Sequence, residues 1–315
     1  MIKVGITGAD SPMAGEIMRL CQRHPDVEIV YAYAPSLAGR NISSVHKGFI
    51  GEEKILFSSN FDATSLDVVF LFDPLYSDSD WVKLMADRPS LHLIIFDKAG
   101  KVALGLQRSP VYGLSEMNRK LMVRGAREAT VPDPVASPAI IALYPLASHL
   151  LLNGDIHIDL SAPEDLITTS KILSSEKEIE NVLASVQCSF SGKIKISASK
   201  SNSSRSMSIN IRFRTPVSVE ELLKIYDSVY DDHNFTFVVT QMNLSPMEVE
   251  ATNKVIINVS KPEPEVVELK VVADPRMRGG AGEAIHIMNL FFGLHEKTGL
   301  DLKTSSWDDA NSNSK

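Results

Sequence analysis

The first hundred residues alternate short apolar stretches with longer connecting segments, and this alternation constrains the fold more than any other feature of the chain. Strands are expected at residues 3–7, 27–33, 68–72 and 92–96. The first strand leads through a turn at Gly8–Pro12 into an amphipathic helix at Ala14–Arg23. Each later strand is separated from the one before it by enough chain for a crossover. The sequence therefore predicts a parallel sheet with helices on both faces.

The pattern changes after Pro138. A helix is expected at residues 139–152 and another at 219–226, where Ser218 precedes Glu220 and Glu221 as a capping signal. Strands are expected at residues 156–160, 193–197, 207–213, 236–239, 255–259 and 267–272, with a polar loop at 197–206. This order predicts a second α+β domain built on a mostly antiparallel sheet.

Composition limits the classes of function. The 315 residues carry a net charge of −7, which argues against a nucleic-acid or anionic-membrane partner. The chain starts directly with a strand pattern and contains no apolar run of about 18 residues, so we expect a cytoplasmic protein with no membrane span.

The two cysteines are too few for a disulfide scaffold and too far apart to form a metal-binding pair. Cys21 falls on the first helix pattern and is expected in the core. Cys188 falls in a stretch, 186–190, that alternates like a strand; a role as nucleophile would need a base or a dipole beside it. The histidines have no metal-like spacing, so no metal site is expected.

Three segments carry a resemblance to a known family: residues 112–119, 132–146 and 279–290. They resemble N-acetyl-γ-glutamyl-phosphate reductase, an NADP-dependent semialdehyde dehydrogenase family of arginine biosynthesis. In that family residues 133–139 read Asn-Pro-Gly-Cys-Tyr-Pro-Thr, and the cysteine attacks the acyl substrate. The matching residue here is Ala136, and a methyl group cannot form a thioester.

The resemblance also implies the domain organisation. Residues 1–137 and 278–304 would form a Rossmann-type dinucleotide-binding domain, because the family returns its last helix to the first domain. Residues 138–277 would form the catalytic and dimerisation domain, and residues 305–315 a disordered tail.

The candidate phosphate-binding loop lies between the first strand and the first helix. Gly5, Gly8 and Ser11 stand at the three positions of a GxxGxxG motif, with serine in place of the third glycine. Pro12 removes one N–H donor from the helix N-terminus, and Asp10 adds a negative charge near the phosphates. These three substitutions all weaken dinucleotide binding.

The second strand ends without the acidic residue that would bind the ribose of NAD. Ser36 and Arg40 match the family's segment for the 2′-phosphate of NADP, which a guanidinium suits well. The same two side chains would equally suit a solvated loop with no ligand. Gly280 and Gly282 match the family segment near the nicotinamide, and glycines at a helix start can also serve architecture alone.

The sequence also departs from the family's pattern in the remaining parts of the active site. Ser175 stands near the position of the histidine base, and the glycine-rich loop is shortened to residues 160–165. The turn at 73–77 carries Leu75 and Tyr76 where the family has His-Gly, and the substrate motif near residues 96–102 lacks its arginine. Arg119 and Arg205 are the retained candidates for substrate binding, with ion pairing as the alternative.

Three functions stay open from the sequence. The first is a catalytically inactive relative that acts by binding a nucleotide, a small anionic metabolite or a protein, as a homo-oligomer (dimer or tetramer) or together with a genuine reductase. The second is an active NAD(P)-dependent oxidoreductase with altered chemistry. The third is a purely structural interaction protein.

Overall fold

The computed structural model describes residues 1–305 except 53–54, 73–74, 76–77, 97–109 and 241–242. The turn at 73–77, apart from Leu75, the substrate motif after Phe96 and the tail beyond residue 305 therefore lie outside the described residues. The chain divides into two compact units: Met1–Pro132 with Gly280–Asp301, and Asp133–Gly279 with residues 302–305 of the described chain.

The first unit contains a parallel sheet, as the alternation predicts. Its strands, among the described residues, are β1 (Ile2–Thr7), β2 (Val27–Tyr33), β3 (Phe57–Ser58), β4 (Val68–Leu71), β5 (His92–Phe96), β6 (Val111–Tyr112) and β7 (Glu128–Val131). Their order is β3-β2-β1-β4-β5-β7-β6, and every pair is parallel. The order reverses direction at β1, as in a dinucleotide-binding sheet.

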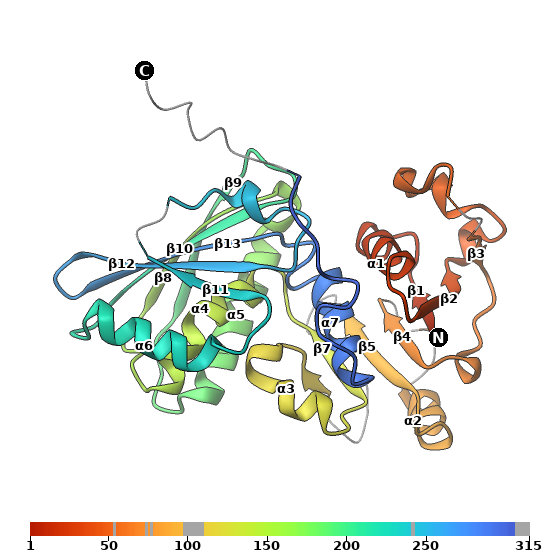
Figure 1. Ribbon diagram of the computed structural model, residues 1–315, viewed down its shortest axis with the longest axis horizontal. Coiled ribbons are helices and arrows are strands. Elements are labelled where there is room, and N and C mark those ends of the chain that lie inside the picture. Colours follow the sequence, from red (N-terminus) through yellow and green to blue (C-terminus); the bar gives the residue numbers. More distant parts are fainter. Residues whose placement is uncertain (53–54, 73–74, 76–77, 97–109, 241–242, 306–315) are drawn as a thin grey trace. The chain divides into compact units, whose positions relative to one another are not determined.

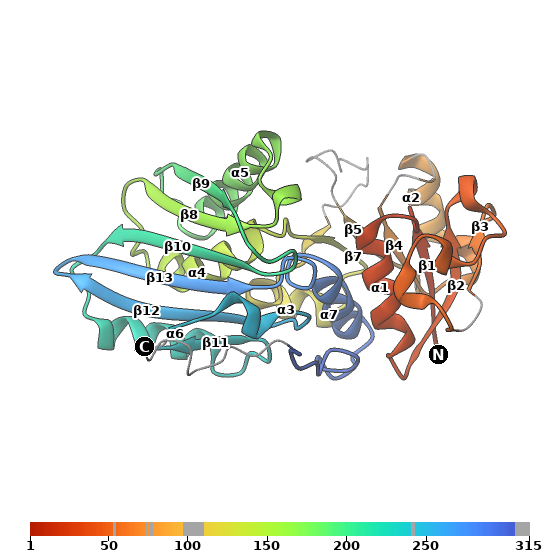
Figure 2. The ribbon, with the colours of Figure 1, turned by 90° about the horizontal axis from the view of Figure 1, so that it is seen from above.

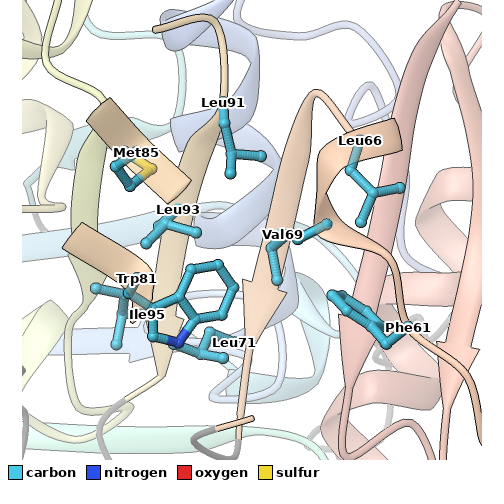
Figure 3. Close-up of a cluster of buried hydrophobic side chains, with 10 residues drawn as sticks. Phe61, Leu66, Val69, Leu71, Trp81, Met85, Leu91, Leu93 and Ile95 are labelled. Atoms are coloured by element: carbon cyan, nitrogen blue, oxygen red, sulfur yellow. The ribbon is translucent and has the colours of Figure 1, made fainter. Parts of the chain in front are cut away.

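Helices cover both faces of this sheet (Figure 2). They are α1 (Pro12–Gln22), α2 (Asp78–Asp87), α3 (Ser115–Val123) and α7 (Ala281–Phe291). α1 and α7 contact each other on one face, and α2 packs on the other, where Trp81 is fully buried against β4 and β5 (Figure 3). α1 starts where local chemistry dictates, since Ser11 caps it and Pro12 occupies its first turn.

The second unit contains a mixed sheet that is mostly antiparallel, as expected. Its strands are β8 (Ile156–Ala162), β9 (Ile194–Lys200), β10 (Met207–Arg214), β11 (Thr236–Val239), β12 (Val255–Glu263) and β13 (Val266–Ala273). Their order is β11-β12-β13-β10-β8-β9. Only the two outer pairs, β11 with β12 and β8 with β9, are parallel.

One face of this sheet is covered by α4 (Ala136–Ser148), α5 (Thr169–Val186) and α6 (Val219–Tyr230) (Figure 1). The predicted cap of α6 is confirmed, because Ser218 and Glu221 form a reciprocal capping box. Short 3-10 helices occur at Pro35–Leu37, Ile42–Ser44, Lys47–Phe49, Ala63–Ser65, Glu164–Leu166 and Pro246–Val249.

Two tyrosines of α6 bind the interior of α4. Pro145 lacks an N–H, so the carbonyl of Ile141, four residues earlier, has no intrahelical donor. The Tyr230 hydroxyl donates to that carbonyl, and the Tyr226 hydroxyl donates to the carbonyl of Ala142 at 2.6 Å. α4 is buried on nearly all sides, which suits its apolar sequence.

Several local predictions are wrong. Residues 186–190 are not a strand: α5 ends at Val186, and Cys188 is exposed in the segment that follows it. β9 continues to Lys200, so the polar loop begins later than residue 197, because strand pairing with β8 satisfies the backbone of these polar residues. α4 begins at Ala136 rather than residue 139.

Candidate functional site

The start of α4 is organised by Asp133. Its Oδ1 atom accepts hydrogen bonds from the backbone N–H groups of Val135 at 2.9 Å and Ala136 at 3.0 Å. Its carbonyl accepts from the N–H of Ser137 at 2.9 Å. The carboxylate therefore satisfies orphan donors at the helix N-terminus, as an N-cap side chain does.

α5 brings two further polar groups to the same residue. The Ser175 hydroxyl lies 2.7 Å from Oδ1 of Asp133 and 2.9 Å from the carbonyl of Lys171. The N–H of Asp133 donates to Oε1 of Glu178 at 3.0 Å. The structure thus brings the Ser175 hydroxyl and the backbone N–H of Ala136 to the same oxygen of Asp133. Sequence reasoning missed Asp133 and Glu178 as the residues that join them.

This cluster lacks the groups that thioester chemistry needs. Ala136 is fully buried and offers only a methyl group. Ser175 is a buried alcohol whose neighbours are a carboxylate and a carbonyl, so no imidazole activates it. Ser137 is also fully buried, and its hydroxyl has no partner among the residues that the structure describes. The arrangement can hold α4 to α5, and it presents no activated nucleophile.

Gly279 packs directly against this cluster. Its φ of +66° is left-handed, and a Cβ at this position would lie 2.6 Å from Cα of Pro134 and 2.8 Å from the carbonyl oxygen of Asp133. Only glycine fits both the conformation and the space. The glycine at this position therefore has an architectural reason.

Arg205 forms an ion pair with a buried carboxylate. Its Nε donates to Oδ2 of Asp274 at 3.2 Å, and the N–H groups of Ala251 and Arg276 donate to the same carboxylate at 2.7 and 2.8 Å. Burial raises the pKa of Asp274, and Arg205 opposes that shift. The observed contact of Arg205 is therefore an ion pair, which was the alternative to substrate binding, and the Arg205 side chain stays partly exposed.

Arg119 also binds a carboxylate, in the first unit. Its guanidinium pairs with the buried Glu296, whose other oxygen lies 2.7 Å from Nε2 of His286 on α7. Asn289, one turn further along α7, donates to the carbonyl of Glu296 at 3.1 Å. Arg119 thus ties α3 to the chain that follows α7.

Several polar groups of the loop between β1 and α1 form hydrogen bonds within the first unit. Gly8 has a φ of +58°, and a Cβ on Gly5 would lie 2.4 Å from Cδ1 of Leu66. The N–H of Ala9 donates to Tyr33, that of Ser11 to Gly8, and that of Ala14 to the Ser11 hydroxyl. Pro12 has no N–H, so the loop offers one donor fewer to a phosphate.

Ser36 and Arg40 follow the carboxyl end of β2. Both are exposed, and neither side chain has a hydrogen-bond or ion-pair partner in the part of the chain that the structure describes. Ligands of parallel α/β sheets bind at the carboxyl ends of the strands. The hydroxyl of Ser36 and the guanidinium of Arg40 are therefore available to bind an anion. A ribose 2′-phosphate requires donors of this kind. Gly280 and Gly282 are buried at the start of α7.

Two aromatic side chains that the sequence did not single out lie at the same edge of the sheet. Phe72, directly after β4, stacks on Phe96 at the end of β5, with ring centroids 4.1 Å apart and an interplanar angle of 13°. The N–H of Phe72 donates to the Thr7 hydroxyl at 2.9 Å. Leu75, also near this edge, packs against the core cluster beneath α2.

The cysteines behave differently from each other. Burial in α1 raises the pKa of the Cys21 thiol to about 12, which makes it inert, whereas Cys188 is exposed. The described residues contain no group of three or more His, Cys, Asp or Glu side chains that could hold a metal ion. Among the helices that the structure describes, none is long and apolar enough to cross a membrane.

Comparison with known sequences gives a consistent result. Residues 3–124 match the semialdehyde dehydrogenase NAD-binding domain family. The chain is 32% identical to N-acetyl-gamma-glutamyl-phosphate reductase of Parabacteroides distasonis, and the alignment covers 98% of this chain and 100% of the relative. A protein of the same name from Phocaeicola vulgatus is 30% identical over the same shares.

Solved structures with this fold include aspartate semialdehyde dehydrogenase II from Vibrio cholerae, with a TM-score of 0.67 at 11% identity, covering 93% of this chain and 99% of that one. Another is aspartate semialdehyde dehydrogenase with NADP from Candida albicans, with a TM-score of 0.61 at 15% identity and coverage of 93% and 98%. At such low identity they show the fold, which agrees with the predicted Rossmann-type and α+β architecture.

Proposed function

The chain belongs to the N-acetyl-γ-glutamyl-phosphate reductase family, a group of semialdehyde-dehydrogenase-like reductases, and from this premise we propose that it is a member without thioester chemistry that acts by binding. The observation that carries the proposal is the cluster at α4. Position 136 holds a buried methyl group, and the position of the base holds a serine bonded to a carboxylate. Loss of both members of a catalytic pair leaves only binding and electrostatic terms.

An assay in the reverse direction tests this proposal. The protein is incubated with N-acetylglutamate semialdehyde, phosphate and NADP⁺, and NADPH formation is followed by absorbance, with the Parabacteroides relative as positive control. We expect no NADPH above the rate of the blank. Turnover in the ordinary enzyme range of about 1–1,000 s⁻¹ would contradict the proposal.

The nucleotide that we propose for the first unit is NADP(H). Exposed Ser36 and Arg40 at the end of β2 support this choice, because they offer a hydroxyl and a guanidinium to a 2′-phosphate. When bound, the nicotinamide of that cofactor supplies or accepts a hydride. The chain's own part is to hold the 2′-phosphate, with Gly8 allowing the loop to turn.

Titration with NADPH and NADH, followed by nicotinamide fluorescence, tests the cofactor. We expect NADPH to bind more tightly than NADH, and Arg40→Ala to weaken NADPH binding roughly ten- to hundredfold, as expected for loss of a charged hydrogen bond. The control is Arg124→Ala, an exposed arginine that precedes β7 and so lies at the opposite edge of the sheet. Equal affinity for the two nucleotides would contradict the assignment of Arg40.

If NADPH binds and some other aldehyde or acyl substrate is reduced, the alternative of an active oxidoreductase with altered chemistry replaces the binding proposal. Absence of NADPH binding at millimolar concentration would remove both and leave a purely structural interaction protein. The titration, together with an assay for reduction of such a substrate, therefore separates the three functions.

We also propose that the protein is a homo-oligomer, dimer or tetramer, and that it assembles with a genuine reductase. The second sheet supports this, because α4, α5 and α6 cover one face while the other carries polar side chains opposite one another, such as Asp159, Asn210 and Lys270. Native mass measurement, alone and mixed with the Parabacteroides relative, is the test. A monomeric mass in both samples would contradict it.

A further inference from the structure

The N-terminus of α4 already holds a negative charge. Three donors converge on Oδ1 of Asp133: the N–H groups of Val135 and Ala136, at 2.9 and 3.0 Å, and the Ser175 hydroxyl, at 2.7 Å. A thiolate at a helix N-terminus is stabilised by these same N–H groups and by the positive end of the helix dipole. At the start of α4, the carboxylate of Asp133 already accepts from these N–H groups and lies at the positive end of the helix dipole.

A second carboxylate lies beside the first. Oε1 of Glu178, on α5, accepts from the N–H of Asp133 at 3.0 Å. An anion placed at position 136 would lie near the Asp133 carboxylate, which already accepts from the N–H there, in a cluster where Ala136 and Ser175 are fully buried. Like charges disfavour a further ionisation, and they do so more strongly where water is excluded.

We propose that the Asp133 carboxylate makes position 136 electrostatically unfavourable for a thiolate, so that restoring a cysteine there does not by itself restore a nucleophile. The inference rests on the proposed absence of thioester chemistry and extends it: the site lost its anion-stabilising function as well as its sulfur. Asp133 now serves as a structural link that caps α4 and fastens it to α5.

Asparagine at position 133 separates charge from geometry. Its side-chain oxygen can accept the same hydrogen bonds from residues 135, 136 and 175, and its amide carries no charge. Asparagine is also an N-cap residue of equal preference. Asp133→Asn therefore removes the negative charge while it keeps the cap.

The experiment measures the pKa of the thiol in Ala136→Cys, made in a Cys188→Ser background, by the ultraviolet absorbance of the thiolate as a function of pH. Cys21 does not interfere, because its pKa is about 12. We expect the new thiol to titrate above the ordinary cysteine value of about 8.5, and Asp133→Asn to lower that midpoint by about one unit, a tenfold gain in thiolate at neutral pH.

A matched variant on α5 serves as the control. Glu176→Gln, whose carboxylate accepts from the N–H of Ile196 at 2.8 Å, should leave the midpoint unchanged. Circular dichroism and thermal unfolding establish that each variant is folded. If Ala136→Cys is not, Asp133→Ala in the wild-type background removes the cap, and a stability equal to that of the wild type would overturn the structural link.

A midpoint that is equal with Asp and Asn at position 133, or one below about 8.5 with both carboxylates present, would overturn the proposal. The measurement uses neither substrate nor cofactor, so its outcome is independent of the turnover assay. The protein could show no turnover in the NADPH assay while the thiol midpoint contradicts the inference. It could also show turnover while the thiol midpoint agrees with the inference.

Discussion

At the scale of single residues, Asp274 is a carboxylate buried at some energetic cost. Its side chain is fully buried, and three donors bind it: Nε of Arg205 and the N–H groups of Ala251 and Arg276. Burial still dominates, so the pKa of Asp274 is raised in the folded protein. In the unfolded chain the same group titrates near its ordinary value of about 3.9.

This shift predicts a pH dependence of stability. A carboxyl whose pKa is raised by folding contributes stability that is fully present below its unfolded pKa and is lost as pH rises through its folded pKa. We expect the free energy of unfolding of the wild type, relative to Asp274→Asn, to increase as the pH falls from neutral toward about 4. Urea unfolding of both proteins at several pH values measures it, and a constant difference would contradict the burial argument.

The sequence predicted the candidate residues here better than their contacts. Arg119 and Arg205 were recognised as candidates for substrate binding, and the structure places each in an ion pair with a buried carboxylate. Those partners, Glu296 and Asp274, lie far along the chain, and a single sequence has no periodic signal that joins them. Asp133 was visible within its motif, but its role depends on α5, which the sequence did not reveal.

At the scale of elements, the join between α4 and α6 depends on a proline. Pro145 leaves the carbonyl of Ile141 without an intrahelical donor, and the buried hydroxyl of Tyr230 supplies one. Burial raises the pKa of the neighbouring Tyr226, which stays a neutral donor to Ala142. An interior proline is thereby tolerated in a fully buried helix.

We expect Tyr230→Phe to lower the free energy of unfolding by about 1–3 kcal/mol, because a buried carbonyl loses its donor. The loss should be smaller when Pro145→Ala is also present, since residue 145 then provides an N–H to Ile141. A double-mutant cycle by urea unfolding measures this coupling. Strictly additive effects of the two substitutions would show that the tyrosine does not compensate for the proline.

The longest helix was not predicted, and its surface explains why. α5 spans 18 residues, yet its fully buried positions are only Ser175, Ile179 and Leu183, spaced four apart. That stripe is narrow, and its first member is polar, so the helical period is weak in the sequence. Four strands of the first sheet and all six of the second were easier, because β-branched residues alternate in them or run without interruption, whereas β3, β6 and β7 were not predicted.

At the scale of the whole molecule, the two thiols report on folding. Cys21 is buried in α1 with a pKa of about 12, while Cys188 is exposed in the other unit. We expect an aromatic disulfide reagent to label one thiol per chain rapidly at neutral pH, and both in denaturant, because labelling requires an accessible thiolate. Cys188→Ser should abolish the rapid phase, and two rapid thiols in the native protein would contradict the buried position of α1.

The fold class was predictable because apolar strand patterns and longer connecting segments alternate over many residues of the sequence. An error in one strand or helix therefore does not change the predicted fold class. The site did not, because its present chemistry depends on a few contacts between α4, α5 and one glycine. These contacts arise from tertiary packing, which a single sequence does not describe.

The first unit is not continuous along the chain, and this affects its synthesis. α7, buried over almost its whole surface, contacts α1, α3 and β5, although residues 133–279, which form most of the second unit, are translated before it. On the ribosome, the sheet face that α7 covers stays exposed to solvent until residues 281–291 have emerged, by which time the second unit can already have folded. The earliest residues to be made are thus the last to reach their native packing, and chaperone demand should be concentrated on them.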